Sequence, residues 1–146
     1  MYHTILAPLD GSKRAEAILP HMEEMARCHG AKAIFLQVIE PILPLSGTGM
    51  TYVKQVGEEF EKKSKQAETY LAGLKGEFHE KGIEARTFVA QGPVVEEIIN
   101  VANRENVDLI AIASHGRSGL SRVFYGSVAA GVLHRVDRPL LIIRSG

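Results

Sequence analysis

The sequence predicts a single α/β domain in which a parallel sheet carries helices on both faces. Two observations predict this class. Five short apolar runs typical of buried strands alternate with four longer segments in which apolar residues recur every three or four positions. The chain has 146 residues, enough for one domain with a sizeable core, and it shows no repeat or low-complexity tract. We therefore expect residues 1–146 to form one domain.

The first strand is predicted at residues 5–9, a short apolar run. Residues 10–12, Asp-Gly-Ser, follow it and are typical of a turn that begins a helix. That helix is expected to end at Gly30, because apolar residues recur at helical spacing up to this glycine. Pro20 lies inside the pattern, so we expect a kink there.

The second strand is predicted at residues 33–39. Residues 41–51 hold two prolines, two glycines and few charges, and they predict a loop. A long amphipathic helix is predicted at residues 52–81, where oppositely charged side chains such as Glu58 and Lys62 stand four residues apart.

The second half of the chain completes the alternation. Strands are predicted at residues 83–89, 107–113 and 139–143. Helices are predicted to begin at Pro93, placed in the first turn, and at Ser127. Strands that alternate with helices in this way are joined by crossovers and lie parallel in one sheet.

The composition favours a protein of the cytoplasm. Basic and acidic residues number 17 each, which gives no sign of a nucleic-acid or membrane-surface partner. No apolar stretch approaches the roughly 20 residues that span a bilayer. The single cysteine cannot form an internal disulfide.

A segment with several glycines and serines, residues 113–127, stands between the fourth strand and the last helix. In open α/β sheets, ligands bind at the carboxyl ends of the strands. Glycine lets backbone N–H groups approach a phosphate, and a helix amino terminus adds partial positive charge. This segment therefore indicates an anionic ligand, and a nucleotide is the expected kind.

Four stretches together resemble one known family. They are residues 7–12, residues 37–40, residues 91–93 with 96–98, and residues 113–127. As a set they are similar to the universal stress proteins, and the resemblance covers essentially the whole chain. It implies a three-layer, Rossmann-like fold of the adenine nucleotide alpha hydrolase type, with strand order 3-2-1-4-5.

The nucleotide-binding branch of that family has the pattern Gly, two residues, Gly, nine residues, Gly, and then Ser or Thr. Gly116, residues 117–125, Gly126 and Ser127 fit the pattern, and Ala113 replaces its first glycine. Alanine is tolerated wherever the backbone is extended, and Ala113 is predicted to end a strand. We therefore expect the site to be retained.

The resemblance implies an adenine nucleotide as ligand: ATP, or else AMP, ADP or cAMP, with Mg²⁺ or Mn²⁺ bound through the phosphates. It implies phosphate binding by backbone N–H groups of Gly116 and of residues 126–128, and adenosine contacts near Asp10 and Val38. The expected nucleotide-binding residues are Pro8, Leu9, Asp10, Val38, Ala113, His115, Gly116, Arg117, Gly119, Gly126, Ser127 and Val128.

Several of these residues also have a purely structural interpretation. Gly126 and Ser127 can serve only as a helix cap, and Asp10 can cap the first helix. The Val38 side chain can belong to the core, and Arg117 can be a solvated loop arginine. The residues alone leave these alternatives open.

The sequence favours binding over catalysis. It lacks the phosphate-binding motif Gly-x-x-x-x-Gly-Lys-Ser/Thr and any evident base or nucleophile for phosphoryl transfer. Ser114 and His115 are adjacent on a predicted extended strand, so they point to opposite sides and do not form a relay. The leading hypothesis is an ATP-binding stress-response protein with a regulatory role. The alternatives are a slow or self-phosphorylating ATPase and a nucleotide-free interaction module.

The resemblance also implies a homodimer. The strand at residues 139–143 is apolar and is expected at an edge of the sheet, where pairing with a second copy would cover it. A downstream protein partner is expected for a regulatory protein, but the sequence does not identify it.

Overall fold

The computed structural model describes residues 1–41, 50–115 and 126–145. Five parallel strands form one sheet in the order β3-β2-β1-β4-β5, which confirms the strand order implied by the family resemblance. The strands are β1 (Thr4–Leu9), β2 (Lys32–Ile39), β3 (Ala85–Gln91), β4 (Leu109–His115) and β5 (Leu140–Ser145).

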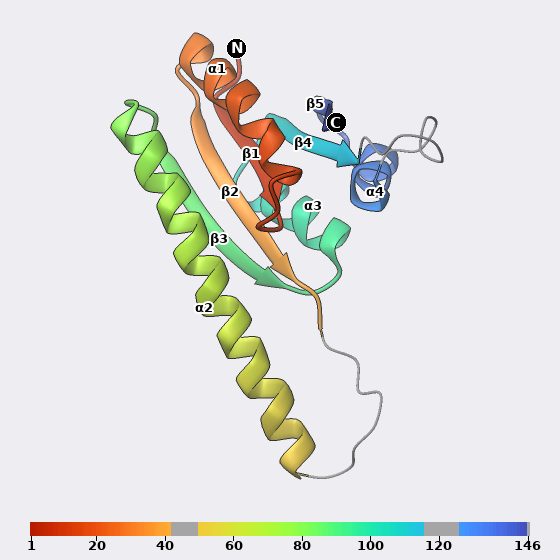
Figure 1. Cartoon of the computed structure of the whole chain (residues 1–146). Coiled ribbons are helices and arrows are strands. Elements are labelled where there is room, and N and C mark those ends of the chain that lie inside the picture. The colour runs from red at the N-terminus through yellow and green to blue at the C-terminus, as the bar shows by residue number, and fades with distance from the viewer. Residues whose placement is uncertain (42–49, 116–125, 146) are drawn as a thin grey trace.

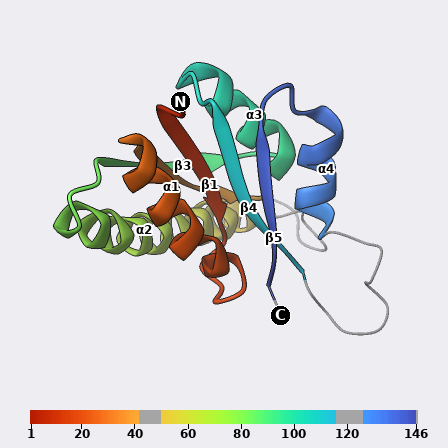
Figure 2. The same cartoon turned by 90° about the horizontal axis from the view of Figure 1, so that it is seen from above.

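Helices cover both faces of this sheet, so the domain has three layers (Figures 1 and 2). A 3₁₀ turn, η1 (Ala15–Ile18), leads into α1 (Leu19–His29), and both lie with α2 (Met50–Glu80) on one face. The opposite face carries α3 (Val94–Arg104) and α4 (Ser127–Arg135). Within the described residues, no helix is both long and apolar enough to span a membrane.

Each face of the sheet has its own apolar core, because successive side chains of a strand point to opposite sides. In β2, Phe35 packs toward α1 and α2, where its ring meets that of Phe78 edge-on at a centroid distance of 4.9 Å. Its neighbours Ile34 and Leu36 belong to the core under α3 and α4. The central strands are therefore apolar on both faces, which explains their continuous apolar runs.

Two expectations about prolines are wrong by small shifts. Pro20 lies in the first turn of α1, where a missing N–H costs nothing, so it does not kink the helix. The preceding residues form the separate turn η1 instead. Pro93 is the extended residue just before α3, with φ −62° and ψ 131°, and not part of the first turn.

The long helix α2 begins at Met50, so the loop predicted at residues 41–51 was drawn two residues too far toward the helix. Residues 42–49 lie outside the described residues.

The third and fourth strands begin two residues later than predicted. Ile83 and Val107 are buried apolar residues, but their N–H groups bond back to the carbonyls of Phe78 and Ala102 in the preceding helices. They therefore close the turn that ends each helix and do not join the ladder. Burial alone does not distinguish such a residue from the first residue of a strand.

The amino ends of β1 and β4 are tied together by side chains. The Asp108 carboxylate accepts hydrogen bonds from the backbone N–H groups of His3 (2.8 Å) and Thr4 (3.0 Å). The Asp108 N–H in turn donates to the Thr4 carbonyl at 3.1 Å. These bonds fix β1 and β4 side by side where the strands begin.

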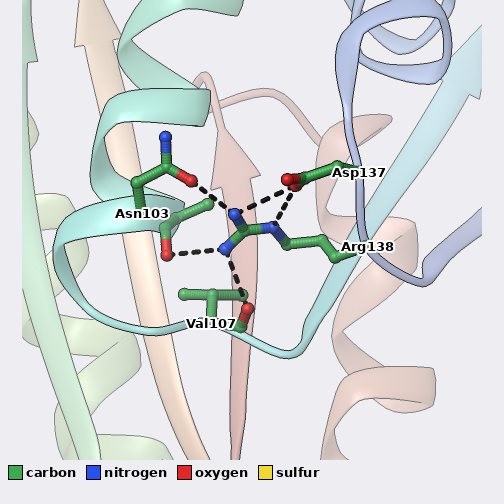
Figure 3. Close-up of polar contacts among 5 residues, drawn as sticks. Asn103, Val107, Asp137 and Arg138 are labelled. Atoms are coloured by element: carbon green, nitrogen blue, oxygen red, sulfur yellow. Dashed lines mark hydrogen bonds and ion pairs between the residues drawn. The ribbon is translucent and has the colours of Figure 1, made fainter.

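Arg138 closes the same end of the fold (Figure 3). Its guanidinium donates to the carbonyl oxygens of Ala102 (2.8 Å) and Val107 (2.9 Å) and to the side chain of Asn103, and it pairs with Asp137. The Ala102 carbonyl lies in the last turn of α3, where helix carbonyls lack intrahelical partners. Arg138 thus caps α3 and holds it to the start of β5.

Candidate functional site

The carboxyl ends of β1 and β4 are not paired with each other. The β1–β4 ladder consists of Ile5 with Leu109 and Leu6 with Ile110. Beyond it, β1 stays paired with β2 as far as Leu9, and β4 stays paired with β5 as far as Ser145. The two central strands therefore separate where their connections run to opposite sides of the sheet. This is the position at which open α/β sheets bind ligands.

A cleft of about 100 Å³ opens at this separation. Six of the residues predicted from the sequence lie on its wall: Pro8, Leu9, Asp10, Ala113, Gly126 and Val128. Six others on the wall were not predicted: Ser12, Arg14, Ala15, Val94, Ile112 and Ser114.

The remaining predicted residues lie beside this cleft or outside the described part of the chain. Ser127 is exposed and begins α4 directly after Gly126. Val38 lines a second cleft, described below. His115 is the last residue of β4, and Gly116, Arg117 and Gly119 fall in the segment that the structure does not describe.

The amino terminus of α4 forms one side of the cleft. Gly126 precedes the helix with φ −56° and ψ 154°, and among the described residues no side chain caps its first N–H groups. These N–H groups also lack intrahelical acceptors and carry the positive end of the helix dipole. Gly126 occupies the capping position and Ser127 is the first helical residue, so Ser127 does not cap the helix with its side chain.

Close packing of α4 on α3 fixes this terminus in place. A Cβ on Gly131 would come within 2.7 Å of Val95 Cγ2, so the glycine allows the two helices to approach closely. Val95 lies one residue from Val94, which forms part of the cleft wall. The sequence of α4 thus positions its own amino terminus against the cleft.

Asp10 and Ser12 shape the opposite side. Asp10 Oδ1 accepts a hydrogen bond from the Ser12 N–H at 2.9 Å, and Ser12 Oγ accepts one from the Ala15 N–H at 3.1 Å. Ser12 therefore caps η1, and the exposed Asp10 braces the turn through Gly11, whose φ of +85° favours glycine. Arg14, two residues further on, brings a cation to the cleft.

Arg14 is a residue that sequence reasoning missed. It lies outside the glycine pattern, and the helical spacing after Ser12 gives no sign that it faces the sheet edge. The one available signal was its place within a turn of the Asp-Gly-Ser segment. A half-buried arginine here supplies the bidentate donors that suit a phosphate or carboxylate.

A second, wider cleft of about 510 Å³ adjoins the first at Asp10. It lies between the ends of β1 and β2 and the middle of α2. Its wall includes Asp10, Gly11, Gln37, Val38, Ile39, Glu40, Lys63, Gln66, Ala67 and Tyr70. Gln37 Oε1 is buried, and no described atom donates a hydrogen bond to it.

Tyr70 ties α2 to the turn beside both clefts. Its hydroxyl donates to Glu16 Oε2 at 2.7 Å. Partial burial, together with the negative charge of Glu16, raises the pKa of Tyr70 above its ordinary value of 10.0. Tyr70 is thus a neutral donor at physiological pH, and its position fixes the distance between α2 and η1.

Ser114 has a structural role in the cleft wall. It is buried, its hydroxyl donates to the Ile143 carbonyl at 3.3 Å, and its carbonyl accepts from Ser145 Oγ at 2.7 Å. These bonds hold β5 to the end of β4. Among the described residues, no group of three or more His, Cys, Asp or Glu side chains is placed to hold a metal ion.

Comparison with known proteins gives a consistent family likeness. The model of the universal stress protein family matches residues 1–144. The chain is 32% identical to universal stress protein YxiE of Bacillus subtilis, with 99% of this chain and 100% of that one covered. It is 27% identical to universal stress protein MJ0577 of Methanocaldococcus jannaschii, with 99% and 96% covered.

Solved structures show the same fold. The structure of MJ0577 matches with a TM-score of 0.81 over 100% of this chain and 98% of that one, at 27% identity. Universal stress protein UspA from Lactobacillus plantarum also reaches 0.81, at 20% identity, with 98% of each chain covered.

Proposed function

Since the chain belongs to the universal stress protein family, we propose that the cleft between β1 and β4 binds an adenine nucleotide, ATP foremost. One observation carries the proposal. Where the two strands separate, the amino terminus of α4 and the half-buried Arg14 line the same cleft. Backbone N–H groups and a guanidinium together favour a phosphate.

The two adjoining clefts suit the two halves of a nucleotide. The phosphates would lie at residues 126–128; Gly116, Arg117 and Gly119, which the family resemblance also assigns to the ligand, lie outside the described residues. The adenosine would extend past Asp10, whose carboxylate can accept hydrogen bonds from ribose hydroxyls, toward Val38. A cleft of about 100 Å³ alone is too small for a whole nucleotide, whereas the adjoining cleft adds about 510 Å³.

Two other members of the fold support an adenine ligand. One solved universal stress protein is described in complex with cAMP, at 19% identity and a TM-score of 0.65. Another, from Archaeoglobus fulgidus, is described in complex with dAMP, at 19% identity and a TM-score of 0.61. In this chain Mg²⁺ or Mn²⁺ would be held by the phosphates, because the described residues supply no cluster of metal ligands.

Regulation through binding fits the site better than catalysis. The buried serine of the cleft is occupied by backbone hydrogen bonds, and the neutral Tyr70 bonds to Glu16. A cytoplasmic stress-response protein would use the nucleotide to change its affinity for a partner protein. A homodimer through β5 would accompany this role, because β5 is an edge strand and Leu140–Ile143 are each only half-buried.

The test begins with protein purified without added nucleotide. The protein is denatured, and the supernatant is separated by anion exchange beside ATP, ADP, AMP and cAMP standards. A stoichiometric adenine nucleotide supports the proposal, and its identity names the ligand. If the supernatant is empty, titration calorimetry with MgATP follows. An empty supernatant together with no heat of binding at millimolar MgATP would overturn the proposal in favour of an interaction module that uses no nucleotide.

A further inference from the structure

The apolar stripe of α2 is longer than the sheet that covers it. The part packed on the sheet comprises Ala67, Leu71, Leu74 and Phe78, all buried in the core. Val53, Val56 and Phe60 continue the same stripe toward the amino end of the helix, at spacings of three and four residues. We call these three residues the protruding stripe.

The protruding stripe lies on the half of α2 that extends past the ends of β2 and β3 (Figure 1). Val53 is 69% exposed, Val56 and Phe60 are half-buried, and none of the three is part of either core described above. In the rest of α2 the same apolar face is buried against the sheet. An apolar row on a projecting helix marks a surface for association.

The charges beside the stripe indicate which surface covers it. Lys54 and Glu61 are exposed and seven residues apart, so they lie two helical turns apart on one flank of the stripe. When two identical helices pair antiparallel about a two-fold axis, the same flank of each helix meets. Lys54 of one copy then faces Glu61 of the other, and the contact occurs twice by symmetry. A parallel pair would bring opposite flanks together, so Lys54 would not meet Glu61 of the other copy.

The same antiparallel arrangement suits the apolar residues. It centres the crossing near Gly57 and brings Val53 of one copy close to Phe60 of the other. A Cβ at Gly57 would meet nothing within 4 Å in a single chain, so the glycine leaves an open surface at the crossing where a second backbone can approach. We propose that the protruding stripe is a self-complementary interface through which two copies of this chain pair antiparallel along α2.

This interface is independent of the nucleotide cleft and of β5, which lies at the edge of the sheet away from β3. A chain with two different two-fold interfaces assembles beyond a dimer. Pairing through both would give a closed tetramer when the two axes intersect at right angles and a filament when the axes do not intersect.

Sedimentation velocity of the full chain over a range of micromolar concentrations tests the proposal. Replacing both apolar residues, Val56→Gln with Phe60→Gln, keeps good helix formers in place; it should reduce the assembly to the β5 dimer, and in a Leu141→Asp background to a monomer. Glu58→Gln, on the opposite side of α2, is the matched control and should leave association unchanged. The substitution Leu141→Asp, aimed at β5, should leave a stripe-dependent dimer of about twice 16.0 kDa.

Charge reversal tests the orientation. Lys54→Glu alone and Glu61→Lys alone should each weaken association roughly tenfold, since each replaces two attractive pairs with two repulsive ones. The double reversal should restore it. Circular dichroism would show that α2 remains helical in every variant, so a loss of association cannot be assigned to unfolding.

A cross-link gives a second, independent readout. In a Cys28→Ser background, which removes the exposed native thiol, Gly57→Cys should form an intermolecular disulfide under mild oxidation. Lys62→Cys, facing away from the stripe, should not. The proposal is overturned if the Val56→Gln, Phe60→Gln chain associates like the unaltered one. It is equally overturned if Leu141→Asp alone gives only monomers, or if the double charge reversal fails to restore pairing.

Discussion

The two ends of the same pair of strands differ sharply. At their amino ends, β1 and β4 are joined by the Asp108 carboxylate and by a backbone bond to Thr4, and Arg138 closes the neighbouring end of α3. At their carboxyl ends the strands are unpaired and a cleft separates them. Side chains and backbone bonds hold the amino ends together, whereas the carboxyl ends carry the amino terminus of α4, where we propose that a ligand binds. We infer that residues at the amino edge of the sheet serve stability and that those at the carboxyl edge serve the proposed binding.

The largest effect on the binding end is expected from Gly126→Asp. The extended φ and ψ of Gly126 suit any residue, and aspartate is a favoured capping residue, so the fold should keep or slightly gain stability. Its carboxylate would occupy the place of a phosphate and repel it. We expect ATP affinity to fall about 100-fold, or about 2.7 kcal/mol, by calorimetry. Gly126→Asn is the neutral control of equal size, and an equal loss in both variants would argue against the charge explanation.

At the amino ends of β1 and β4, Arg138→Ala should lower stability and leave nucleotide binding unaffected. The substitution removes the guanidinium bonds to the carbonyls of Ala102 and Val107, of which Ala102 keeps only the bond from the Val107 N–H, and we expect the free energy of unfolding to fall by about 2–3 kcal/mol. Nucleotide affinity should stay unchanged. Urea titration measures the first quantity. Asp137→Asn serves as control, because Asp137 is 84% exposed and its ion pair should contribute little. Equal destabilisation by both substitutions would contradict the capping role of Arg138.

Two aspartates, one at each end of the β1–β4 pair, allow the two ends to be compared by the same substitution. Asp108→Ala removes two backbone hydrogen bonds and should lower the free energy of unfolding by about 1–2 kcal/mol, with nucleotide binding intact. Asp10→Ala removes one bond from an exposed turn and should cost less stability but weaken nucleotide binding. Thermal unfolding with and without MgATP separates the two outcomes. A ligand-induced shift that survives Asp10→Ala in full would remove Asp10 from the site.

Tyr70 should produce the smallest and most pH-dependent effect. Its folded pKa is raised above the unfolded value, so its contribution to stability is fully present below about pH 10 and is lost as the pH rises further. Tyr70→Phe removes the hydrogen bond to Glu16 and should cost about 1 kcal/mol at neutral pH. The difference in free energy of unfolding between the unaltered and Tyr70→Phe chains, measured by urea titration, should shrink above about pH 10. A gap that is constant across this range would show that the hydroxyl is not responsible.

The periodicity of the apolar residues predicted the strands, the helices and the layers well, because burial on one or both faces dictates that pattern. The strand order came from the resemblance to a family. The pattern failed where a buried residue closes a turn, as at Ile83 and Val107, and where Pro20 starts a helix instead of bending one. These outcomes depend on backbone hydrogen bonds that leave no trace in apolar spacing.

The candidate site was predicted only in the two segments that carry family motifs, after β1 and around the start of α4. Gly126 and Val128 lie on the cleft wall, as does Asp10, because motif residues stand at fixed positions next to strand ends. Arg14 and Val94 reach the same cleft from a 3₁₀ turn and from the helix on the far face. Their approach depends on how the layers pack, and neither residue carries a local signal for it.

The most direct test of the account is a titration of ¹⁵N-labelled protein with MgATP, followed through the backbone amide resonances. We expect saturable shifts that are largest at Ser127, Val128 and residues 10–12, while His3, Thr4 and Asp108 at the opposite end stay unchanged. Saturable shifts confined to the amino end, or no shifts at millimolar nucleotide, would contradict the claim that the parted ends of β1 and β4 form the binding site.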